Sequence, residues 1–107
     1  MDRFAHYERG GRALPEWRAH LAHAMSEATY RMNPATVEEA ATVLRSAQAT
    51  PEQRIGAALA LRIANQPRER IRVAVDAAVD DRMRDALEAV ADSEDDGVIE
   101  KALQRLT

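Results

Sequence analysis

Residues 50–66 read T-P-E-Q-R-I-G-A-A-L-A-L-R-I-A-N-Q, and this stretch decides the fold because it predicts one complete helix with its own start and stop. Thr50 suits the N-cap and Pro51 the first helical position. Gln53 stands three residues after the cap, where its side chain can close a capping box. The run Asn65-Gln66-Pro67 is typical of a helix end.

The apolar pattern of this helix recurs along the chain. Its unit is an apolar residue followed three and four positions later by alanine and a second apolar residue. The six copies are Leu21/Ala24/Met25, Val37/Ala40/Ala41, Ile55/Ala58/Leu59, Ile71/Ala74/Val75, Met83/Ala86/Leu87 and Ile99/Ala102/Leu103. Their first members are 16, 18, 16, 12 and 16 residues apart. Alanine lets helices approach closely and the longer neighbour fills the remaining space, so the three steps of 16 predict three helical hairpins.

Composition supports an all-α fold. The 107 residues include 22 alanines and only four aromatic residues, and no β-branched residues alternate with period two. We expect residues 14–107 to form a single helical domain of about six short helices, stacked as three antiparallel hairpins. An irregular six-helix bundle is the alternative. Residues 1–13 are expected to be a flexible or loosely docked segment, or else to place Phe4 and Tyr7 over the open end of the first helix pair.

Local signals predict the other boundaries. The first helix should run from Pro15 to about Met32 and the second from Thr36 to about Gln48, with Asn33-Pro34 between them. Residues 67–92 contain no glycine and no internal proline, so a single helix of about 25 residues is one possibility. The apolar stripe turns by about 100° within them, however, so we prefer a turn near Asp80-Asp81 with an Asp as the new N-cap. Ser93 is the predicted N-cap of the last helix.

Charge and composition exclude several classes of protein. There is no cysteine, no signal-peptide pattern at the start, and no run of about 18 apolar residues, so we expect a cytoplasmic protein without a membrane partner. The net charge is −3, and residues 73–107 carry ten acidic and four basic side chains, a balance of −6. Nucleic acid favours a basic face, so we expect no nucleic-acid partner.

One side-chain pattern resembles a metal site. Glu16, His20, His23 and Glu27 share one side of the first helix, and imidazole and carboxylate groups can bind zinc or iron. The same spacing also gives two i, i+4 pairs on a solvated face, which we prefer. There is no Gly-rich phosphate loop and no plausible triad, so we predict no enzyme, no catalytic residue, no cofactor and no metal.

Residues 51–106 resemble HEAT-type repeats, especially the short bacterial variety. The resemblance is carried by R-I-G-A-A-L-A-L at 54–61, by D-R-M-R-D-A-L-E-A-V-A-D-S-E-D-D-G-V-I-E-K-A-L-Q-R-L at 81–106, and by the turns between them. It implies a right-handed α-solenoid of stacked helix pairs that acts as a protein-interaction or regulatory adaptor module. The polar positions predicted to bind another protein are Glu38, Thr42, Arg68, Arg70, Arg72, Asp76, Glu100 and Gln104.

Two further possibilities stay open. Some HEAT-like proteins act as lyases on tetrapyrrole chromophores, so a HEAT-like protein that binds a small ligand or chromophore is the alternative function. Self-association is the other: the last helix would be apolar at Val98, Leu103 and Leu106, and a homodimer through a terminal helix would cover these side chains.

Overall fold

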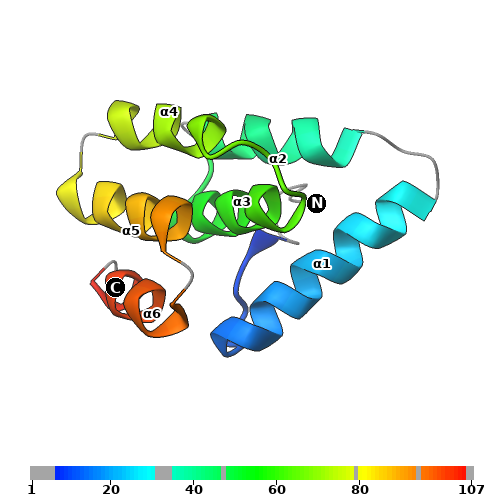
Figure 1. The fold of residues 1–107 in the computed structure, drawn as a ribbon, viewed down its shortest axis with the longest axis horizontal. Coiled ribbons are helices and arrows are strands. Elements are labelled where there is room, and N and C mark those ends of the chain that lie inside the picture. The colour runs from blue at the N-terminus through cyan, green and yellow to red at the C-terminus, as the bar shows by residue number, and fades with distance from the viewer. Residues whose placement is uncertain (1–6, 31–34, 47, 79, 94, 106–107) are drawn as a thin grey trace.

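The protein is all-α, as its composition predicts (Figure 1). The computed structural model describes residues 7–30, 35–46, 48–78, 80–93 and 95–105, with the side chains of 24–30 and 35–36 left out. Within these residues there are six helices and no strand. The helices are α1 (Leu14–Tyr30), α2 (Ala35–Arg45), α3 (Pro51–Ile63), α4 (Glu69–Ala77), α5 (Asp81–Asp92) and α6 (Asp96–Gln104).

Helix α3 lies at the centre and contacts α1, α2 and α5. Figure 1 shows α2 and α4 on one side of the α3 and α5 layer, and α1 and α6 on the other. Helix α2 runs antiparallel to α3, and α4 runs antiparallel to α5. Helix α6 packs on α5 and also touches α1. The described residues form a body of 37 × 29 × 26 Å.

The most extensive helix contacts are α2 with α3 and α4 with α5, whereas the spacing paired the first helix with the second and the third with the fourth. These two largest contacts therefore join neighbouring predicted hairpins, although the predicted contacts of α1 with α2 and of α5 with α6 are also present. The reason is that every helix turns its stripe toward one common core, so chain spacing does not specify the closest neighbour. The stacked solenoid stays a prediction.

Both ends of α3 follow their local signals. The Thr50 hydroxyl accepts the Gln53 backbone N–H at 3.1 Å, and the Gln53 side-chain oxygen accepts the Thr50 N–H at 3.0 Å, which closes the predicted capping box. At the other end Asn65 has a φ of 59°, the left-handed conformation that asparagine tolerates. The N–H groups of Asn65 and Gln66 donate to the carbonyls of Arg62 and Leu61, and this Schellman motif precedes Pro67.

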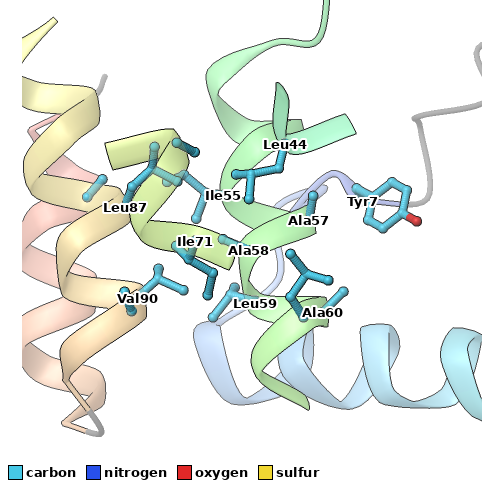
Figure 2. Packing of buried hydrophobic residues seen from close by; sticks show 14 of the residues in the cluster. Tyr7, Leu44, Ile55, Ala57, Ala58, Leu59, Ala60, Ile71, Leu87 and Val90 are labelled. Atoms are coloured by element: carbon cyan, nitrogen blue, oxygen red, sulfur yellow. The ribbon is translucent and has the colours of Figure 1, made fainter. Parts of the chain in front are cut away.

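The repeated apolar unit forms the core, as predicted (Figure 2). Every member whose side chain is described is buried, except Val37, which is half-buried. Sequence reasoning missed that the middle of α3 is buried on every side: Ile55 to Leu61 are all buried, including Ala57 and Ala60 off the stripe. A helical segment that is apolar on every side is one that neighbours enclose, and this part of α3 is such a segment.

The predicted break at Asp80 is confirmed. Helix α4 ends at Ala77, and the Asp80 carboxylate caps α5 by accepting the Arg82 N–H at 3.0 Å. The Ser93 prediction is wrong, because Asp95 is the N-cap of α6 and accepts the Gly97 N–H at 2.8 Å. Helix α5 continues to Asp92, so Ser93 terminates that helix instead and its hydroxyl accepts the Asp95 N–H.

Two more predicted boundaries differ or cannot be compared. Helix α2 ends at Arg45, three residues before Gln48. The predicted stop at Asn33-Pro34, and the side chain of Thr36, lie outside the described residues.

The N-terminal segment, residues 7–13, enters the core. The Tyr7 side chain is 1% exposed, and its hydroxyl donates to Glu39 of α2 at 3.2 Å. The indole N–H of Trp17 donates to the Tyr7 carbonyl at 3.1 Å. Arg9 forms two hydrogen bonds with Glu100 of α6 at 2.8 and 2.9 Å and lies over the Trp17 ring. These contacts join the segment to α1, α2 and α6, while Phe4 lies outside the described residues.

Removing the Asp80 cap is expected to lower the free energy of unfolding by about 1 kcal/mol. Asp80→Ala deletes the oxygen that accepts the Arg82 N–H, whereas Asp80→Asn keeps an acceptor of the same geometry. Urea denaturation should therefore separate the two variants, with the Asn variant within about 0.5 kcal/mol of the parent. Equal losses in both would assign the effect to the charge of Asp80 and contradict the capping role.

Candidate protein-interaction surface

Six of the eight predicted partner-binding residues belong to α2 or to α4 and its N-cap. These two helices contact each other. The Arg70 guanidinium forms an ion pair with Glu38 at 3.2 Å, so two of the predicted positions meet directly. The Thr42 hydroxyl donates to the Glu38 backbone carbonyl. The members on this side are Glu38, Thr42, Arg68, Arg70, Arg72 and Asp76.

The remaining two predicted residues lie elsewhere. Glu100 and Gln104 are on α6, on the other side of the α3 and α5 layer (Figure 1). Glu100 is already engaged with Arg9. Arg72 points away from α2, because its guanidinium pairs with Asp92 at the end of α5. The structure therefore gathers the α2 and α4 residues on one side and separates the α6 residues from them.

Beside these polar residues the surface contains an apolar hollow that the sequence did not predict. Its volume is about 350 Å³ and lies within the range of ligand clefts. Four helices contribute to it: the end of α2, the start of α3, the second half of α4 and the start of α5. We call it the Val73 groove; its lining residues are Leu44, Arg45, Arg54, Val73, Ala74, Ala77, Ala78, Met83 and Leu87.

Val73 is the most exposed large apolar side chain among the described residues, at 60%. The floor around it is rigid, since Leu44, Met83 and Leu87 belong to the buried core. A sequence signal for this groove did exist. Val73 lies about 160° around the helix from Ile71, so it is an apolar residue on the side opposite the core stripe. One valine outside the core stripe does not predict a groove by itself, because neighbouring helices must supply the other lining residues.

The rim of the Val73 groove is basic. Arg45 is exposed in the last turn of α2, and Arg54 is held in place by a hydrogen bond from its Nε to the Ser46 carbonyl at 3.0 Å. Arg84 donates to the carbonyl of Ala78, a lining residue, at 2.8 Å, and lies 3.9 Å from Asp81. None of the lining residues is acidic. The charge of the rim is thus positive, whereas the net charge of residues 73–107 as a whole is negative.

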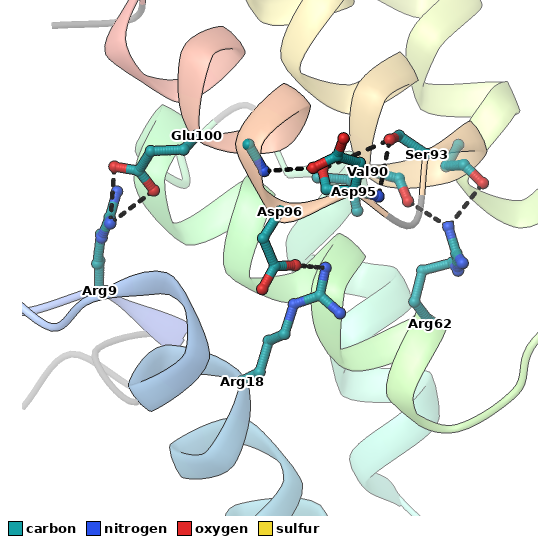
Figure 3. Close-up of polar contacts among 10 residues, drawn as sticks. Arg9, Arg18, Arg62, Val90, Ser93, Asp95, Asp96 and Glu100 are labelled. Carbon is teal, nitrogen blue, oxygen red and sulfur yellow. Dashed lines mark hydrogen bonds and ion pairs between the residues drawn. The ribbon is translucent and has the colours of Figure 1, made fainter.

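Two other hollows are shaped by contacts within the chain. One of about 370 Å³ lies between the N-terminal segment, Trp17, Pro51 and Leu103. Two of its three charged lining residues are engaged within the chain: Glu8 accepts from Gln53, and Arg9 binds Glu100. The other, of about 110 Å³, lies beside two arginines that tie helices together (Figure 3). Arg18 pairs with Asp96 at 2.9 Å, and Arg62 donates to the last carbonyls of α5, those of Val90 and Ala91.

The stripe that resembles a metal site is only partly described. Glu16 and His23 are exposed, His20 is half-buried, and the side chain of Glu27 lies outside the described residues. Within the described part of the chain, no group of three or more His, Cys, Asp or Glu side chains is arranged to hold a metal ion. None of the helices in that part is both long enough and apolar enough to span a bilayer.

Comparisons with protein-family models, curated proteins and solved structures give no match. The resemblance to HEAT-type repeats therefore stays a prediction.

Proposed function

We propose that the chain is a non-enzymatic protein-interaction module, of the adaptor or regulatory kind, whose partner docks on the side formed by α2 and α4. The observation that carries this proposal is the Val73 groove, in which apolar side chains line an open hollow on a floor made by the core. A hollow that is lined mainly by apolar side chains and rimmed by polar ones is typical of a surface that another protein covers.

The polar residues beside the groove supply the rest of the proposed surface. Arg70 and Glu38 bridge α4 and α2 there, and Thr42 stands one turn further along α2. A polar rim around an apolar centre is the usual anatomy of such a site, in which the centre supplies most of the affinity and the rim sets the choice of partner. Glu100 and Gln104 lie on the opposite side and are left out of the proposed surface.

A photo-crosslinking residue at position 73 tests this proposal, and the same residue at position 98 is its matched control. Val73 and Val98 are the two exposed large apolar side chains of the described chain, and they lie on opposite sides, on α4 and α6. We expect a discrete adduct with a protein of the same cell from position 73, lost when excess unlabelled chain competes. Adducts of equal yield from both positions, or none from position 73, would contradict the proposal.

Self-association through α6 is a second candidate with one supporting observation. Val98 is 48% exposed, although Leu103, which was expected to share that face, is buried within the chain, and Leu106 lies outside the described residues. A single exposed valine offers a small contact compared with the roughly 800 Å² per partner of a stable interface. Sedimentation should therefore show a monomer at high micromolar concentration; a dimer dispersed by Val98→Gln would support this candidate instead.

A further inference from the structure

The lining of the Val73 groove restricts the class of partner that it can accept, provided that the proposed function holds. Seven of its nine lining residues are apolar and the other two are Arg45 and Arg54. An occupant must therefore present apolar side chains to the floor and negative charge to the rim. A basic segment would place like charges together, which is unfavourable even where solvent screens them.

The overall charge of the chain does not oppose an acidic partner at this place. The net charge is −3, but charges further apart than a Debye length of about 8 Å are largely screened at physiological salt. Charges at the groove itself therefore matter most: the two charged lining residues are both arginines, Arg45 and Arg54, and the Arg84 guanidinium bonds to the carbonyl of Ala78, another lining residue. Asp81 offsets only part of this charge, at 3.9 Å from Arg84.

The helices that form the Val73 groove favour one backbone conformation of the bound segment. All four segments that form the groove belong to helices or their ends, and within the described residues there is no strand edge to which an extended peptide could add. An extended segment would leave its backbone N–H and C=O groups without partners against apolar side chains, whereas a helix satisfies its own. A helix is thus the conformation that this groove accepts at least cost.

We infer that the Val73 groove binds an acidic amphipathic helix of another protein. Its apolar residues, at i, i+3 or i+4, and i+7, would contact Val73, Leu44 and Met83, and its Asp and Glu side chains would face the rim arginines. A second copy of this chain is a poorer occupant, because its acidic helices α5 and α6 already bury their apolar stripes in their own core, α6 with Ile99, Ala102 and Leu103. Only Val98 would be left to enter the groove.

The probe for this inference is a fluorescein-labelled peptide of about 16 residues, long enough to form a helix, with leucine at i, i+3, i+4 and i+7 and with glutamate and alanine elsewhere. We expect saturable binding to the full chain, by fluorescence anisotropy, with a Kd of about 1–100 μM that weakens as salt rises. A peptide of the same composition with a scrambled stripe, and one with lysine in place of glutamate, should each bind at least about tenfold more weakly.

Single substitutions in the protein test whether the peptide binds at the Val73 groove. Arg45→Glu and Val73→Gln should each weaken binding about fivefold to tenfold, because one reverses a rim charge and the other removes the exposed apolar contact. Lys101→Glu is the matched control for Arg45→Glu, since each removes a cation from the last turn of a helix, and it should change the Kd less than about twofold. All three positions are exposed, and urea denaturation verifies that each variant is folded.

Three results would overturn the inference: equal binding of the scrambled or lysine peptide, no effect of either groove variant, or a dimer of the chain alone that Val73→Gln disperses. If the crosslink from position 73 captures a protein but the acidic peptide does not bind, the class of partner is wrong and the interaction function stands. If the crosslink also fails, both are wrong.

Discussion

Replacing Gly56 by alanine is expected to lower the free energy of unfolding by about 2–4 kcal/mol, although alanine is the better helix former. A Cβ at Gly56 would lie 1.9 Å from the carbonyl oxygen of Tyr7 and 2.8 Å from its carbonyl carbon. Both are backbone atoms of the N-terminal segment, so no side-chain rotation relieves the contact. Gly56 is thus required because another part of the chain crosses α3 at this point.

The expected magnitude follows from what the extra methyl group would displace. To make room, the segment around Tyr7 must move off α3, and the buried Tyr7 ring and the hydrogen bond from Trp17 would be lost with it. Removing a large aromatic side chain from a core costs about 3–5 kcal/mol, and the gain in helix propensity returns about 0.5–1 kcal/mol. Against a total stability of about 5–15 kcal/mol this loss is large.

Urea denaturation followed by the fluorescence of Trp17, which is the only tryptophan, measures this effect. Trp17 is also a local reporter, since its ring lies 3.2 Å from the same Cβ position. Gly97→Ala is the matched control: Gly97 is exposed in α6, and its Cβ would approach only the Asp95 side chain, at 3.2 Å. That variant should stay within about 0.5 kcal/mol of the parent. A Gly56→Ala protein as stable as the parent would show that Tyr7 does not cross α3 in solution.

Truncating Ile71 is expected to cost about 2–5 kcal/mol, whereas truncating Val73 should change stability by less than about 0.5 kcal/mol. The two residues are two positions apart in sequence on the same helix, but Ile71 is fully buried and Val73 is 60% exposed. Ile71 belongs to the buried core cluster (Figure 2), and α4 packs on α5 and α2, so Ile71→Ala leaves a cavity in the core beneath α4. Val73→Ala removes atoms that mostly face solvent.

The comparison of Ile71→Ala with Val73→Ala tests the repeated apolar unit and the groove together. Helix α4 has nine residues, too few to be stable alone, so its place depends on the packing of Ile71, Ala74 and Val75. Thermal and urea denaturation should agree on the order of the two variants. If Val73→Ala were the more damaging, Val73 would be part of the core, and the proposed surface on α2 and α4 would lose its centre.

Features that depend on a few adjacent residues could be predicted from the sequence. The capping box of Thr50 and Gln53 and the Asp80 cap each join groups no more than three residues apart, so distant contacts hardly affect them. The apolar stripe could also be predicted, because the helical period places its members on one side of each helix. The prediction of Ser93 as the cap failed because Asp95 is also a cap-forming residue, and the position at which α5 ends decides which of the two caps α6.

Features that depend on which helix surfaces meet could not be predicted. The Val73 groove needs four helices to bring its lining residues together, and Val73 alone gave little sign of it. Likewise, Glu38 and Arg70 were both selected as polar positions, but their ion pair follows from the contact of α2 with α4. The docking of Tyr7 against Gly56 joins residues far apart in the chain and has no local signature.

The ion pair between Arg9 and Glu100 has a consequence for the order of folding. The two residues are 91 positions apart, whereas the contacts of α2 with α3 and of α4 with α5 join consecutive helices. Closing a loop of nearly the whole chain costs more entropy than closing a hairpin, so this contact belongs to the last steps of assembly. Interactions that form after the rate-limiting barrier slow escape from the native state without hastening its formation. We therefore expect the contact of Arg9 with Glu100 to contribute to the lifetime of the folded protein rather than to the speed at which it folds.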